Sequence, residues 1–332
     1  MRFSFSYPSC VESLNHPVGF ARPAELLDLA REVEDRGLYA LWAADHLAPW
    51  PAVIDPEKGP PNWYDIMVAM ACVASVTSNV KLGLGVIVVP LRDPAVLAKQ
   101  VATLDAFSDG RVLFGVGIGS ARQELELLRP RESGANRGRM LDEALEAMQA
   151  IFTEPSASFE GEYYAFRELA FAPKPVQSPL PLYLSGTVAP TLRRAARYGH
   201  GLLAAGHSPA AFAEWRERLR AEMEAAGREI SEIDLTFCPS VMLDESHERA
   251  IERFARSRMG QRYLKRTGLE PEEAATENMV GTPEEVAERL HLLAEVGMTH
   301  CVPTHVGVDT FEEYLDQFRL YVDRVIPCYE RG

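Results

Sequence analysis

The sequence of 332 residues lacks several features that mark particular classes of protein. No apolar run approaches the ~20 residues that a membrane span needs, and the opening MRFSFSYPSC lacks the long apolar core of a signal peptide. Positive charge is scarce, because 34 Lys and Arg stand against 48 Asp and Glu and leave a net charge of −14. This acidity argues against nucleic acid or an anionic membrane as a partner.

Metal and nucleophile motifs are also missing. The five cysteines are odd in number and have no metal-ligand spacing, so we expect reduced thiols in a cytoplasmic protein; they are Cys10, Cys72, Cys238, Cys301 and Cys328. No His, Asp or Glu cluster has ligand spacing either, and no metal site is predicted. The sequence contains neither a Gly-x-Ser-x-Gly elbow nor a Gly-x-x-x-x-Gly-Lys phosphate loop.

Strand and helix patterns alternate along the whole chain. About eight strands with intervening helices are the signature of a TIM barrel, so residues 1–332 are predicted to form one α/β domain, a (β/α)8 barrel with insertions. One insertion is a hairpin over Ala157–Phe166, and another is Met259–Met279, which is expected to be irregular and polar and to move as a lid. The expected strands are Arg2–Tyr7, Leu38–Ala43, Val80–Pro90, Arg111–Gly119, Pro181–Leu184, Gly201–Ala204, Ile233–Val241 and Met298–Pro303.

The most informative stretch is Val80–Gly119, which has the pattern strand, helix, strand. Both strands are continuous apolar runs, VKLGLGVIVVP and RVLFGVGIG, as is typical of parallel strands buried on both faces. Glycines inside strands mark a bulge or a close approach to the backbone, although packing alone can also require them. They are Gly83, Gly85, Gly115, Gly117 and Gly119. Their spacing does not match the Gly-x-Gly-x-x-Gly dinucleotide fingerprint.

Polar residues follow most of the expected strands, at the face where barrel enzymes hold their sites. Three of the eight histidines fall there, namely His46, His207 and His305. Because histidine titrates near neutral pH, we take His46, directly after Asp45, as the candidate catalytic residue. Any one of these histidines can instead be structural, and Cys10, after the first strand, is a further candidate.

The turn after the fifth strand is a candidate phosphate site. Small residues, Ser185, Gly186, Thr187 and Val188, separate this strand from a helix. Free backbone N–H groups at a helix N-terminus bind phosphate. An ordinary strand-to-helix turn is the alternative.

Together these blocks resemble the bacterial luciferase-like monooxygenase superfamily, from Phe3 to about Tyr321. The matching segments are LWAADH, LGVIVVPLRDPAVLAKQVATLDAFSDGRVLFGVGIGS, FEGEYYAF, PKPVQSPLPLYLSG, LRRAARYGHG and VGTPEEVAERL. The resemblance implies a TIM barrel that binds FMN or the deazaflavin coenzyme F420, with the ring over the strand ends. It also implies a cis peptide at Gly85–Val86, with Val86 against the back of the ring.

The resemblance further implies the roles of individual residues. Asp45 would contact the deazaflavin and His46 would act near the transferred hydride. The remaining residues expected at the coenzyme are Gly85, Val86, Ile87, Val88, Ile118, Gly119, Ser120, Ser185, Gly186, Thr187 and Val188. Ser120 stands where sugar-phosphate dehydrogenases of the F420 branch have a glutamate, which argues against that reaction.

Coenzyme F420 is the expected cofactor, and a cluster of Arg122, Arg129, Arg131, Arg137 and Arg139 could hold its polyanionic tail. The predicted activity is hydride transfer between F420 and a small organic substrate. An FMN-dependent two-component monooxygenase that uses O2 with a separate reductase is the alternative. A coenzyme-binding barrel without catalysis is a third. A homodimer is expected.

Overall fold

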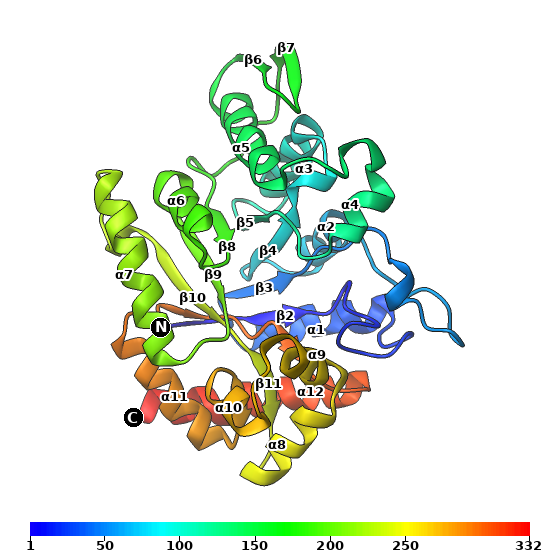
Figure 1. Ribbon diagram of the computed structural model, residues 1–332, viewed down its shortest axis with the longest axis vertical. Helices are drawn as coiled ribbons and strands as arrows, with labels where there is room; N and C mark the ends of the chain where they lie inside the picture. Colours follow the sequence, from blue (N-terminus) through cyan, green and yellow to red (C-terminus); the bar gives the residue numbers. More distant parts are fainter.

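Eight parallel strands close into a barrel at the centre of the computed structural model, which describes residues 1–332 (Figure 1). The first strand is split at Ser4 into β1 and β2, which pair at opposite ends of the same sheet and so close it. The predicted TIM barrel is confirmed. In sheet order the strands are β1 (Arg2–Phe3), β13 (His300–Cys301), β10 (Asp234–Cys238), β9 (Gly201–Ala205), β8 (Leu182–Ser185), β5 (Val112–Gly117), β4 (Lys81–Val88), β3 (Ala40–Ala43) and β2 (Phe5–Tyr7).

Amphipathic helices surround the barrel. In α3 the Asp93 carboxylate caps the first turn by accepting from the backbone N–H groups of Ala95 and Val96, and Pro94 begins the helix. None of the helices is long and apolar enough to cross a membrane. The outer helices are α1 (Pro23–Asp35), α2 (Ile66–Val76), α3 (Pro94–Phe107), α5 (Arg137–Thr153), α6 (Ala189–Tyr198), α7 (Pro209–Ala225), α11 (Pro283–Glu295), α12 (Phe311–Leu320) and α13 (Ile326–Arg331).

A second, three-stranded parallel sheet extends from the barrel. The predicted strand Ile233–Val241 is broken at Pro239, which has no N–H to give to a ladder, and its continuation enters this sheet. The sheet consists of β12 (Met279–Gly281), β11 (Ser240–Leu243) and β14 (His305–Val306), with α8 (His247–Arg256) beside it.

The prediction of an irregular segment over Met259–Met279 was wrong. It folds into α9 (Arg258–Thr267) and α10 (Pro271–Thr276). The Ser257 hydroxyl caps α9 by accepting from the Gly260 N–H, and Gly268 ends it with a φ of +74°. Met259 and Tyr263 are buried, so α9 is anchored by packing; movement of this segment as a lid stays a prediction.

The hairpin insertion is present and slightly longer than predicted. Its strands are β6 (Ser156–Glu160) and β7 (Ala165–Ala170), paired antiparallel. The hairpin projects beyond α5 at the top of Figure 1. A short helix, α4 (Arg122–Leu128), follows β5 and lies at the barrel mouth.

The opposite, N-terminal end of the barrel is closed by a buried polar network around Asp234. Its carboxylate accepts from Tyr183 Oη at 2.9 Å, from His300 Nδ1 at 3.0 Å and from Arg2 Nη2 at 2.6 Å. His300 Nε2 lies 2.6 Å from Ser4 Oγ, so serine, histidine and aspartate form a chain. Ser4 and His300 are completely buried. Residues at the N-terminal face of a TIM barrel usually serve stability rather than catalysis. We therefore interpret this network as one that stabilises the fold at the N-terminal end of the barrel.

Candidate active site

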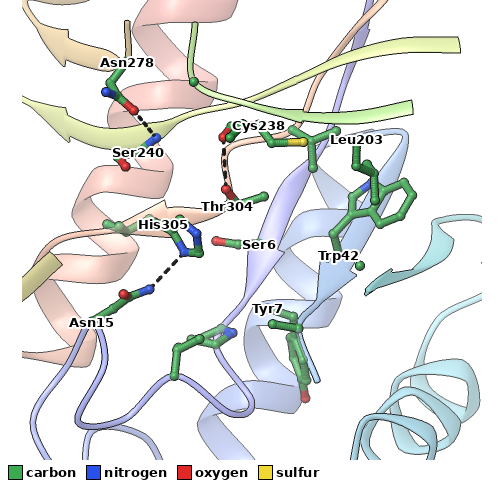
Figure 2. Close-up of a pocket in the computed structure, with 18 of the residues that line it drawn as sticks. Ser6, Tyr7, Asn15, Trp42, Leu203, Cys238, Ser240, Asn278, Thr304 and His305 are labelled. Carbon is green, nitrogen blue, oxygen red and sulfur yellow. Dashed lines mark hydrogen bonds between the residues drawn. The ribbon is translucent and has the colours of Figure 1, made fainter. Parts of the chain in front are cut away.

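A cavity of about 190 Å³ opens at the C-terminal ends of the strands (Figure 2). Side chains and backbone from nearly every barrel strand line it, including Tyr7, Trp42, Val86, Ser185, Cys238 and His305. Figure 2 shows His305 pointing toward Ser6 across this space, with Trp42 at the far side. This is the face where TIM-barrel enzymes carry their sites.

The end of β4 is reshaped where it meets the cavity. The Gly85–Val86 peptide bond is cis, as predicted, and the pairing of β4 with β5 shifts between Leu84 and Ile87. A Cβ on Gly117 would lie 2.8 Å from Val86 Cγ2, and one on Gly119 would lie 2.7 Å from Val88 Cγ1. The β5 glycines thus make room for the displaced valines of β4, which exposes Gly85 and Val86 to the cavity.

Asp45 is enclosed at the end of β3. Its side chain has no exposed surface. One oxygen accepts from the Val88 backbone N–H at 2.8 Å, and Arg92 forms a two-nitrogen pair with the carboxylate, including Nη2 to Oδ1 at 2.8 Å. Asp45 thereby ties the loop after β3 to the end of β4, and its carboxylate is not open to the cavity.

His46 is held by Glu124, a residue that the sequence analysis did not select. His46 Nδ1 lies 3.0 Å from Glu124 Oε2, and the other carboxylate oxygen accepts from the backbone N–H groups of Leu47 and Ala48. Burial raises the pKa of Glu124, but the hydrogen bonds from His46 and the two N–H groups outweigh it and leave the pKa below its usual range. An ionised carboxylate only accepts, so Nδ1 carries the proton and Nε2 is left with its lone pair.

Two indoles surround the His46 ring. Its centroid lies 4.8 Å from that of Trp63 and 5.9 Å from that of Trp50. The His46 side chain keeps 15% of its surface exposed. The ring is therefore fixed in orientation but reachable, although it is not one of the residues that line the cavity itself.

A second cavity of about 400 Å³ adjoins the first at Ser185, which lines both. It lies between the start of α5 and the start of α6 and is lined by Ile118, Val188 and Thr191 among others. The backbone N–H groups of Thr187 and Val188 have no acceptor in the protein, and Gly186 has a φ of +105°. Unused N–H groups at a helix N-terminus fit a phosphate.

The other predicted residues occupy different positions. Ile87 and Val88 are buried in the core, whereas Ser120 is exposed. His305 lines the mouth cavity, but His207 and Cys10 do not. Burial raises the pKa of the Cys10 thiol and lowers that of His207, which Glu277 partly opposes. No group of three or more His, Cys, Asp or Glu side chains could hold a metal ion.

Three of the five arginines in the predicted cluster form ion pairs, and Arg131 forms none. Arg122, Arg129 and Arg139 form ion pairs with Glu126, Glu132 and Glu162 respectively. Arg137 donates instead to the backbone oxygens of Ile118 and Gly119, the latter at 2.8 Å. These partners weaken the case for this cluster as the holder of a polyanionic tail.

The fold and this site define a class, a TIM-barrel enzyme with a cavity over its strand ends. The chain matches the luciferase-like monooxygenase family over residues 1–300 and belongs to it. The predicted family is confirmed, and membership makes the chain an oxidoreductase.

Curated relatives and solved structures agree with this placement. An F420-dependent glucose-6-phosphate dehydrogenase of Kineococcus radiotolerans is 32% identical over 233 residues, 69% of this chain and 67% of that protein. The F420-dependent glucose-6-phosphate dehydrogenase of Nakamurella multipartita is 27% identical over 304 residues, which cover 91% of this chain and 84% of that protein.

Among solved structures, a monooxygenase from Streptomyces bottropensis superposes with a TM-score of 0.81 at 22% identity, covering 99% of this chain and 100% of its own. The F420-dependent tetrahydromethanopterin reductase of Methanopyrus kandleri superposes at 0.75 and 20% identity, covering 99% of each chain. At these identities the superpositions establish the fold alone.

Proposed function

We propose that this oxidoreductase uses coenzyme F420 and transfers hydride between it and a small organic substrate. The carrying observation is His46, which the Glu124 carboxylate holds just after β3, at the barrel face where Gly85 and Val86 line the mouth cavity. The F420-dependent relatives at 27–32% identity support the choice of coenzyme. Bound F420 supplies two-electron hydride chemistry.

The residues that line the two cavities fit the ring and the phosphate of F420. Gly85 and Val86 line the mouth cavity, and the neighbouring cavity offers the unpaired N–H groups of Thr187 and Val188. Ser185 joins the two spaces. We assign the first to the ring and the second to the phosphate.

His46 would move the proton that accompanies the hydride. In oxidation the Nε2 lone pair accepts a proton from the substrate hydroxyl, and in reduction the resulting Nε2–H returns it. Glu124 stabilises the imidazolium formed in between, because its carboxylate lies 3.0 Å from Nδ1. Asp45 acts indirectly, by fixing Val88 and the loop that carries His46.

Titration of the purified protein with F420 and with FMN tests the coenzyme. We expect F420 to bind more tightly, and the reduced F420 complex to consume no oxygen. Preferential FMN binding, with oxygen uptake on addition of reduced FMN, would support the two-component monooxygenase instead. F420 binding without turnover of any substrate would point to a barrel without catalysis.

A further inference from the structure

Two arginines at the barrel mouth have no acidic partner. Arg266 lines the mouth cavity, forms neither a hydrogen bond nor an ion pair, and lies 5.3 Å from the centre of the Tyr263 ring. Arg262, one turn earlier in α9, makes a single hydrogen bond, from Nη1 to Asn15 Oδ1 at 3.3 Å. Arg92, by contrast, is ion paired with Asp45. Arg262 and Arg266 thus place two guanidinium groups without a carboxylate partner one helical turn apart.

The same arginine fixes the orientation of His305. Because Asn15 Oδ1 accepts from Arg262, the Asn15 amide nitrogen faces His305 Nδ1, 3.0 Å away (Figure 2). Nδ1 must then be the acceptor, and the proton lies on Nε2. His305 is thus arranged as a donor in the cavity.

The surroundings of His305 are positively charged. His305 lines the mouth cavity and its side chain is exposed to that space. Burial lowers the pKa of His305 to about 4, and Arg262, Arg266, His16 and His46 push in the same direction. The nearby acid, Glu277, is already bonded by Tyr263 Oη at 2.6 Å. Glu277 keeps its charge, but neither Arg262 nor Arg266 forms an ion pair with it or with any other carboxylate.

We propose that Arg262, Arg266 and His305 form a subsite for an anionic group of the substrate, a carboxylate or a phosphate. Guanidinium groups favour both, through charge-assisted hydrogen bonds. Gly85 and Val86 line the same cavity, so the anion would anchor the substrate beside the proposed ring position. The substrate assignment rests on the proposed function, but anion binding itself needs no coenzyme.

Nuclear magnetic resonance titration of the coenzyme-free protein tests the subsite with two probes, inorganic phosphate and acetate. We expect the His305 ring signals to shift with at least one of them. In the double variant Arg262→Gln/Arg266→Gln the affinity should fall about tenfold or more, the loss expected for hydrogen bonds to charged groups. Lys265→Gln, an exposed cation of the same helix without a partner, is the matched control and should bind as wild type does.

The possible results of this titration distinguish the anion subsite from the proposed F420-dependent function. Equal probe affinity in the wild type and the double variant, or no binding by the wild type, overturns the subsite. Loss of F420 affinity with probe binding unchanged also overturns it, because the arginines would then serve the coenzyme. A wild type that binds the probes but not F420 refutes the proposed function and leaves the subsite standing.

The relative affinities of phosphate and acetate tell which anion the subsite prefers. Should the double variant unfold, Arg266→Gln alone replaces it, since that side chain is exposed and makes no hydrogen bond.

Discussion

The two sides of the barrel mouth hold histidines in opposite states. On the acidic side (Asp45, His46 and Glu124), a carboxylate binds His46 Nδ1 and leaves Nε2 free to accept a proton. On the basic side (Asn15, Arg262, Arg266 and His305), an amide donates to His305 Nδ1 and leaves Nε2 as a donor. The neighbours alone thus leave the imidazole with a free lone pair on one side and with a donor N–H on the other.

The contrast between the two sides is tested most directly by removing the His46 imidazole. His46→Ala should lower turnover by roughly 10²–10⁴-fold, the usual range for general acid–base loss, with little change in F420 affinity. Turnover, coenzyme affinity and melting temperature are measured on one sample. If His46 were only a scaffold residue, the melting temperature would fall while the folded enzyme kept its rate.

Lowering the pH should reduce the folding stability through a histidine on the basic side. His16, buried behind His305 and bonded through Nδ1 to the Val308 oxygen at 2.8 Å, has its pKa lowered by burial from 6.5 to about 4, which that hydrogen bond partly opposes. Between these values the unfolded chain binds more protons than the folded one, so stability falls as pH falls through the window. His16 accounts for up to about 3 kcal/mol.

Denaturant unfolding of wild type and His16→Gln at several pH values measures this contribution. Since glutamine does not titrate, the variant should lose less stability between pH 6.5 and 4 than the wild type does. Parallel pH profiles for the two proteins would mean that the pKa of His16 is the same in the folded and unfolded chain.

Glu124→Gln tests the acidic side more finely. The amide keeps the shape but removes the charge, and loss of one hydrogen bond to a charged group corresponds to about 10–150-fold in turnover. Glu126→Gln, on the exposed face of the same helix, is the control. Wild-type turnover in Glu124→Gln would mean that the Glu124 carboxylate does not assist the proton transfer.

The smallest expected effect concerns the phosphate cavity between the two helix starts. An added Cβ at Gly186 meets nothing closer than Thr191 Oγ1 at 3.8 Å, so Gly186→Val acts through its φ of +105°. The displaced backbone should lower F420 affinity about tenfold, for a cost of 1–3 kcal/mol. Gly227→Val carries similar strain, with φ +73° at the end of α7, and should leave F420 affinity intact. Equal affinities in both variants would place the phosphate elsewhere.

The acidic side was easier to predict than the basic side. Asp45 and His46 come just after β3, and Gly85 and Val86 lie near the end of β4, so a local pattern placed them at the barrel mouth. Glu124 was missed because it lies 78 residues from His46 in sequence, and only the closure of β3, β4 and β5 brings the two together.

On the basic side the helix signals themselves were overlooked. Ser257 and Gly268 are ordinary caps, and Met259 and Tyr263 have helical spacing, yet the polar composition of α9 suggested a loop. Even with α9 predicted, its contact with Asn15 could not be, because it joins residues 247 apart in sequence. Side chains that meet only through tertiary packing leave little trace in a single sequence.

The central claim is that the two histidines hold their protons on opposite nitrogens. Nitrogen chemical shifts of the labelled protein near neutral pH report the tautomer of each ring, with His46→Ala and His305→Gln used for assignment. The account predicts a protonated Nδ1 on His46 and a protonated Nε2 on His305. His46 protonated only on Nε2, or His305 protonated on Nδ1, would contradict it.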